Sequence, residues 1–196
     1  MKFLSSICGL VLLFFFTALV SCKSKQRKAE NKGATISDTA KFYPIERFIK
    51  DEMQYVDLRD FSITETNIQS GDSTTRSISK DEFLSIATEV LNQTNWFAQN
   101  KYLYKETVFQ DLGTESYTIN YQTDQADIKS IDLLLNEQTN LPKRMFIRVI
   151  HQEGKNTSTI QYSWVAGKQF SIAKSEKNPA ALIEQSSKTI QWKNRP

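Results

Sequence analysis

The spacing of apolar residues changes along residues 42–196, and the change divides this part of the chain in two. Between Pro44 and Leu91 apolar residues mostly recur every three or four positions, which is the spacing of a helix that buries one face. Beyond about residue 100 they recur at every second position, as they do in strands with one buried face. The pattern therefore predicts helices first and an antiparallel sheet after them.

Two helices are expected in the first part. One begins at Pro44, because proline is favoured in the first turn of a helix. Another follows Ser79, which forms an S-x-x-E capping box with Glu82. The expected buried faces are Ile45, Phe48, Ile49 and Val56 in the first helix, and Phe83, Ile86, Ala87, Val90 and Leu91 in the second.

Strands are expected from the alternating segments and from the turns between them. A short one covers Phe61–Thr64, and Gly71-Asp72 marks a turn. Pro179 is expected to open a short helix, Ala180–Gln185. The remaining strands are Tyr102–Gln110, Ser116–Gln122, Ile128–Asn136, Lys143–Gln152, Thr157–Val165, Lys168–Ala173 and a last one around Ile190 and Trp192. Short connections make successive strands antiparallel neighbours, so the fold class is α+β: two N-terminal helices packed on a twisted antiparallel meander of about six or seven strands, with a half-barrel as one form of the sheet.

The N-terminal segment has the layout of a signal peptide. Lys2 precedes an apolar run, Phe3–Val20. The run ends in Leu19, Val20, Ser21 and Cys22, and this tetrapeptide resembles a lipobox, the recognition motif of type II signal peptidase. The resemblance implies that residues 1–21 are removed and that Cys22 receives lipid. Several acyl chains are needed for stable anchoring, because one chain holds a protein only marginally.

An uncleaved transmembrane anchor is the alternative for the same segment. A mostly apolar run of eighteen residues can just span a bilayer. The basic residues that follow would then place the rest of the chain in the cytoplasm by the positive-inside rule.

The residue after Cys22 bears on where a lipoprotein would be anchored. In sorted lipoproteins, a lysine such as Lys23 after the cysteine is not an inner-membrane retention signal. This resemblance implies an outer-membrane anchor that faces the periplasm.

The positive charge of the chain is concentrated beside Cys22. The formal net charge is +3, but residues 23–32 alone hold five Lys and Arg against one Glu. Residues 33–196 hold 19 Lys and Arg against 21 Asp and Glu, so no nucleic-acid-binding face is expected. Residues 22–41 are polar and without periodicity, which predicts a flexible tether, and residues 42–196 are expected to form a single α+β domain.

Cysteine and glycine usage excludes several kinds of chemistry from residues 42–196. The two cysteines of the chain are Cys8 and Cys22, so this part has no disulfide, Cys-ligated zinc or cysteine nucleophile. Its four glycines are scattered among turns, which leaves none for a phosphate-binding loop. The serine-hydrolase motif G-x-S-x-G is also missing. We therefore expect no cofactor, no metal and no enzymatic activity.

The remaining candidates for acid–base chemistry are few. His151 is the only histidine, and it is interpreted either as a general base or as an exposed residue at the end of a hairpin. A lone histidine lacks the partners of a catalytic or metal site, so the second interpretation is favoured. The carboxylate pairs Asp57/Asp60 and Asp111/Glu115 have the residue types for proton transfer, but acidic residues near turns are common.

Aromatic residues are numerous on the expected strands. Two interpretations are open: they line an apolar cavity, as in the half-barrel carriers of the LolA/LolB type, or they form an ordinary core. The candidate cavity residues are Tyr121, Tyr162, Trp164, Phe170 and Trp192.

The order of elements also resembles that of a family. The segments Ser79–Phe83, Ile131-Asp132-Leu133-Leu134, Ser163-Trp164 and Ile190-Gln191-Trp192 are similar to those of uncharacterised lipoproteins of Bacteroidota, and the resemblance implies no activity. The expected function is that of a membrane-anchored, non-enzymatic module that binds a protein or another component of the envelope. The alternative is a periplasmic carrier of an apolar ligand or lipid.

Overall fold

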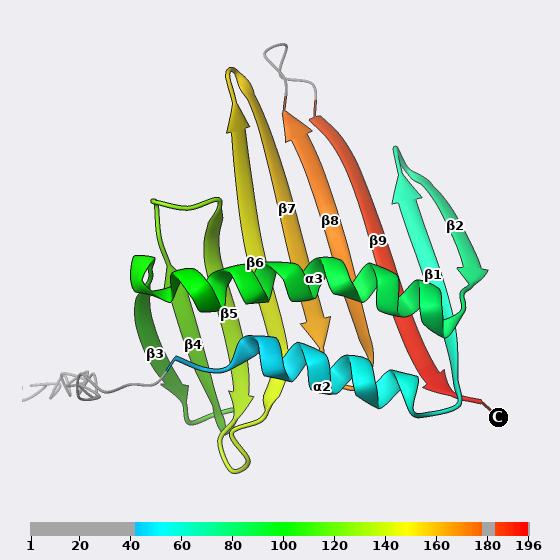
Figure 1. The fold of residues 1–196 in the computed structure, drawn as a ribbon, viewed down its shortest axis with the longest axis horizontal. Helices are drawn as coiled ribbons and strands as arrows, with labels where there is room; N and C mark the ends of the chain where they lie inside the picture. Colours follow the sequence, from blue (N-terminus) through cyan, green and yellow to red (C-terminus); the bar gives the residue numbers. More distant parts are fainter. Residues whose placement is uncertain (1–41, 178–182, 196) are drawn as a thin grey trace, which may run out of the picture. The chain divides into compact units, whose positions relative to one another are not determined.

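The computed structural model describes residues 42–177 and 183–195. The helices are α2 (Ile45–Asp57), α3 (Lys80–Asn100) and a single 3₁₀ turn, η1 (Lys101–Leu103). The strands are β1 (Phe61–Gln69), β2 (Asp72–Ser77), β3 (Lys105–Asp111), β4 (Ser116–Gln122), β5 (Ile128–Asn136), β6 (Pro142–Glu153), β7 (Asn156–Val165), β8 (Gln169–Lys177) and β9 (Ile183–Asn194). Both long helices cross the same face of one sheet (Figure 1).

The strands form one antiparallel sheet in the order β2-β1-β9-β8-β7-β6-β5-β4-β3. Strands β3 to β9 are a continuous meander, and β1 pairs with the last strand of that meander. The edge strands β2 and β3 each have one neighbour, so the sheet is open. The α+β class and the antiparallel meander are confirmed, with nine strands where about six or seven were expected.

Both helices begin and pack as their sequences indicate. In α2 the buried residues are Ile45, Phe48, Ile49 and Val56, as predicted. The capping box of α3 is present: Glu82 N donates to Ser79 Oγ at 3.2 Å, and Ser79 N donates to Glu82 Oε2 at 2.9 Å. The helix runs on to Asn100 and also buries Thr94 and Phe97, which were not part of the expected face. Ile86 and Leu91, which were part of that face, are only partly buried.

The core lies between this helix layer and the sheet. Alternate residues of the central strands point toward the helices and are almost fully buried, which is what a strand with one covered face produces. These residues include Ile131, Leu133, Met145, Ile147, Tyr162, Trp164, Phe170, Ile172, Ile190 and Trp192.

One strand was not expected, and two expectations on element positions were wrong. The segment after Gly71 is strand β2, although all six of its side chains are exposed and no apolar alternation marks it. Tyr102 belongs to η1, so β3 starts only at Lys105. Residues 183–185 are part of β9 rather than a helix. Residues 183–185 lie where the strands extend past α3 (Figure 1). A strand segment that no helix covers has no buried face, so it does not show the usual alternation of apolar and polar residues.

Several predictions concern residues outside the described part. These are the signal peptide 1–21, the lipobox with Cys22, most of the tether, and Pro179 with residues 180–182. Among the helices of residues 42–177 and 183–195, none combines the length and the hydropathy that a membrane span requires.

Candidate ligand-binding face

The sheet has a second face, opposite α2 and α3, which we call the open face. Strand pairing lines up its side chains in rows that run across the strands. The first row crosses all nine strands and consists of Thr75, Thr66, Thr189, Ser171, Ser163, Phe146, Asp132, Asn120 and Thr107. The hydroxyl oxygens of Thr66 and Thr75 lie 3.0 Å apart, and Asn120 donates to Asp132, so these two pairs of the row are hydrogen-bonded across strands.

Two further rows flank the first one. The second consists of Ser77, Thr64, Gln191, Gln169, Val165, Arg144, Leu134, Thr118 and Phe109. The third consists of Ser73, Ile68, Ser187, Ala173, Gln161, Arg148, Ser130, Gln122 and Lys105. On β2, β1, β9, β8 and β7 the three rows contain no charged residue, and most of their side chains end in a hydroxyl or an amide. Solvated sheet faces usually carry charged side chains, so this uncharged area is a distinctive surface.

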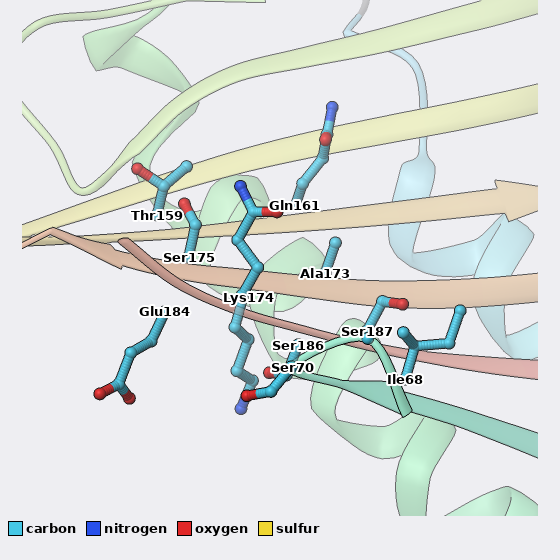
Figure 2. A pocket seen from close by; sticks show the side chains of 12 residues that line it. Ile68, Ser70, Thr159, Gln161, Ala173, Lys174, Ser175, Glu184, Ser186 and Ser187 are labelled. Atoms are coloured by element: carbon cyan, nitrogen blue, oxygen red, sulfur yellow. The ribbon is translucent and has the colours of Figure 1, made fainter. Parts of the chain in front are cut away.

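A hollow of about 770 Å³ lies at the uncharged end of the open face, and we call it the neutral hollow. Its lining includes Ile68, Thr159, Gln161, Ala173, Ser175, Gln185 and Ser187. Figure 2 shows Thr159, Gln161 and Ser175 extending to one side of the strands, while Lys174 and Glu184 extend to the other. The side of the hollow formed by the open face therefore presents hydroxyl and amide groups, and the charges at its border belong to the opposite side of the sheet.

A second hollow, of about 540 Å³, lies toward the other edge of the sheet, and we call it the basic hollow. It is lined by Lys105, Gln122, Thr123, Asp124, Lys129, Arg148 and Ile150. Three cations therefore face one carboxylate. The Lys129 ammonium donates to the backbone carbonyl of Asp124 at 3.2 Å rather than to its carboxylate.

The third row connects the two hollows. Gln161 lines the neutral hollow and lies directly opposite Arg148, which lines the basic hollow. On the same strand as Arg148, Phe146 is partly buried and Arg144 lies with its guanidinium carbon 5.8 Å from the centre of the Phe146 ring. Within the described ranges, neither Arg144 nor Arg148 forms a salt bridge. These two guanidinium groups are exposed and available to a ligand.

The five aromatic residues considered as cavity lining lie on the other side of the sheet, under the helices. All are buried, and at most 4% of any of them is exposed. Trp164 stacks on Phe170 with ring centres 4.7 Å apart, and Phe83 of α3 meets the Trp192 ring edge-on at 5.4 Å. These rings are in mutual contact, which is the arrangement of a packed core.

Tyr121 and Tyr162 lie outside the cluster formed by Trp164, Phe170 and Trp192. The Tyr121 ring packs on Phe97 at 4.9 Å, and its hydroxyl accepts a hydrogen bond from Tyr43 N at 2.9 Å. The Tyr162 hydroxyl donates to Glu89 Oε1 of α3 at 3.0 Å. Burial is the main cause that raises the pKa of both phenols well above the ordinary value. Both side chains thus connect the sheet with the helix layer.

The structure gives the acid–base candidates surface roles. His151 Nδ1 lies 3.0 Å from Asp127 Oδ2, and both side chains are about half exposed or more. Asp60 forms a salt bridge with Arg195 at 3.3 Å. Asp111 accepts from Thr114 Oγ1 at 2.7 Å and from Gly113 N at 2.9 Å, and these bonds lower its pKa. An aspartate held ionised in a turn is poorly suited to act as a general acid.

Neither a metal site nor a similarity to known proteins indicates a function for the described residues. The part of the chain that the structure describes contains no group of three or more His, Cys, Asp or Glu residues that could hold a metal ion. No family model matches the chain, and the comparisons with curated proteins and with solved structures find no match.

Apolar patterning did not predict the open face as a site. The signal was present in the sequence as Ser, Thr and Gln between the apolar residues of β7, β8 and β9, as in Gln161-Tyr162-Ser163-Trp164. Their alignment into rows depends on strand register, which the sequence pattern alone does not give.

Proposed function

We propose that this chain is a membrane-anchored, non-enzymatic binding protein of the cell envelope, and that the open face is its binding surface. The observation that carries the proposal is the row that joins the neutral hollow to the basic hollow through Gln161 and Arg148. Binding sites are concave and contain a few converging polar groups, and this face has both properties. The helix layer closes the opposite face, so the open face is the broad surface left for a ligand (Figure 1).

Photo-crosslinking in native membranes tests the binding surface. A photoreactive amino acid replaces Gln161 on the open face or, as a matched control, Thr88 on the exposed side of α3. The expected result is a crosslinked adduct from position 161 and none from position 88. Adducts from position 88 alone, or an uncrosslinked monomer in both cases, would contradict the proposal.

The anchor is tested separately by mass spectrometry of the mature N-terminus. The lipobox Leu19-Val20-Ser21-Cys22 supports a chain that begins with an acylated Cys22 and is held at the periplasmic face of the outer membrane. An intact Met1 together with an unmodified Cys22 would overturn this part of the proposal and favour a transmembrane anchor.

A carrier of an apolar ligand is the competing proposal. It needs apolar space between the sheet and the helices, where Trp164, Phe170 and Trp192 lie in contact with one another. These contacts support the binding protein over the carrier. Native mass spectrometry distinguishes the two: a lipid that co-purifies with the intact chain favours the carrier, and a ligand-free mass favours the binding protein.

A further inference from the structure

We infer that the ligand of the open face is an anionic polysaccharide that lies across the strands, with its acidic groups at the basic hollow and its hydroxyl groups on the uncharged rows. The inference rests on the proposed function, because it assumes that the open face is the binding surface. It adds the chemical class of the ligand and the residues that recognise each part of it.

The uncharged rows match a ligand rich in hydroxyl groups. Serine and threonine hydroxyls both donate and accept hydrogen bonds, and glutamine offers two donors and an acceptor. A sugar hydroxyl has the same dual character, so each can bond to the side chains of Gln161, Ser175 or Ser187 in the neutral hollow. A protein partner fits this surface poorly, because protein interfaces are depleted in serine and their binding energy comes mainly from Trp, Tyr and Arg.

The basic hollow supplies the complementary charge. Lys105, Lys129 and Arg148 face a single carboxylate, that of Asp124. Arg148 is exposed and, among the described residues, has no carboxylate within ion-pair distance. Its planar guanidinium can bind a carboxylate through two parallel hydrogen bonds. Acidic sugars carry carboxylates of this kind, so the hollow favours an acidic over a neutral polysaccharide.

The combined length of the two hollows indicates a polymer. The third row runs from Ile68 on β1 to Lys105 on β3 and crosses seven strand-to-strand intervals. At about 4.8 Å per interval the row is roughly 34 Å long, which exceeds the size of a small molecule. Two residues from Arg148 on the same strand, the partly buried ring of Phe146 offers an apolar surface to the C–H face of a sugar ring.

Binding measurements with the full-length protein in detergent test the inference. The probes are polygalacturonate, a neutral polysaccharide of similar length, and polyglutamate as a charged peptide. We expect polygalacturonate to bind with an affinity that falls as salt is raised, and the other two to bind at least tenfold more weakly. Polyglutamate binding as tight as polygalacturonate binding would overturn the inference, as would the absence of polysaccharide binding.

Charge-reversal variants locate the site. Arg148→Glu and Lys105→Glu are expected to weaken polygalacturonate binding at least tenfold, and Arg148→Gln less so. Lys50→Glu on the exposed side of α2 is the control, with no expected effect. Thermal melts are the check that each variant is folded. An equal loss in Lys50→Glu would mean that overall charge, and not the basic hollow, controls binding.

The two proposals can fail independently. A protein captured by crosslinking at position 161, without polysaccharide binding, would retain the open face as the binding surface and reject the polysaccharide. Polysaccharide binding that the Arg148→Glu and Lys105→Glu variants leave unchanged would reject the open face as its site.

Discussion

The indole nitrogen of Trp164 donates a hydrogen bond of 3.1 Å to Glu52 Oε2, and the same oxygen accepts a 2.7 Å bond from Gly167 N. Glu52 belongs to α2, whereas Trp164 and Gly167 lie at the end of β7 and in the turn that follows it. One carboxylate oxygen therefore attaches the first helix to the centre of the sheet. This contact fixes the helix layer on the face opposite the proposed binding surface.

Replacing Glu52 should destabilise the domain more than replacing its neighbour. Glu52→Ala leaves the buried Trp164 N–H without a partner and should lower the free energy of unfolding by about 2 kcal/mol. Asp51→Ala removes an exposed carboxylate 3.8 Å from Arg47 and should cost no more than about 0.5 kcal/mol. Urea unfolding measures both. Equal losses in the two variants would show that the Glu52 contact does not stabilise the domain.

A second polar contact lies at the β1–β2 end of the helix-covered face. Glu65 is only 3% exposed, and Arg76 Nε and Nη2 donate to its two oxygens at 3.2 and 3.3 Å. Arg76→Ala should lower the free energy of unfolding more than the loss of a solvated ion pair does, because it leaves the buried carboxylate of Glu65 with weaker partners.

The exposed ion pair of Arg195 with Asp60 provides the control for this variant. Arg195→Ala should cost less than about 1 kcal/mol, since that pair is solvated. Urea unfolding of both variants decides the point. If the Arg76→Ala variant is as stable as Arg195→Ala, the hydrogen bonds from Arg76 to the buried Glu65 carboxylate contribute negligibly to the free energy of unfolding.

Elements with one apolar face were predictable from sequence, and elements without one were not. The spacing of Ile45, Phe48 and Ile49 identified α2 because burial against the sheet requires that stripe. Strand β2 has no such requirement, since it is an edge strand whose side chains are all exposed. Main-chain pairing and contacts such as that of Thr66 with Thr75 stabilise its hairpin with β1. Such contacts do not require apolar residues at regular positions, so the sequence shows no periodic pattern there.

The candidate site escaped prediction for a different reason. The aromatic residues were the most visible feature of the strands, but residues such as Trp164 and Phe170 pack against each other and against α3. The proposed site uses the residues between them, and its hollows exist only because nine strands align their side chains. That property depends on long-range register, which a local pattern does not contain.

The capping box of α3 should make part of the stability dependent on pH. The backbone N–H of Ser79 and the Arg76 guanidinium both hydrogen-bond to the Glu82 carboxylate and lower its pKa. A lowered pKa in the folded state stabilises the protein above the ordinary glutamate value of about 4.3, and the effect is lost as the pH falls through the folded value.

Glu82→Gln isolates this effect because glutamine keeps the capping geometry and removes the charge. The variant should be less stable than the wild type at pH 7, and the difference should shrink below about pH 4. Urea unfolding at several pH values measures the difference. A gap that stays constant from pH 7 to pH 3 would contradict the linkage.

Buried phenols should make the domain sensitive to alkali. Burial raises the pKa of Tyr104, Tyr121 and Tyr162 well above the ordinary value of about 10. Above that pH the unfolded chain loses these protons first, so stability should fall as the pH rises. Tyr104→Phe should show a smaller fall than the wild type between about pH 9 and 11. Identical alkaline profiles for the two proteins would argue against burial as the cause.

The two buried tryptophans of the core should respond differently to the same substitution. Trp164 donates its N–H to Glu52, whereas the Trp192 N–H is buried without a hydrogen-bond partner in the described residues. Changing either residue to Phe removes a similar apolar area, but only Trp164→Phe breaks a hydrogen bond to a charged group. Trp164→Phe should therefore cost about 1 kcal/mol more than Trp192→Phe, measured by urea unfolding. A larger loss for Trp192→Phe would mean that packing against Phe83, and not hydrogen bonding, sets the order of the two effects.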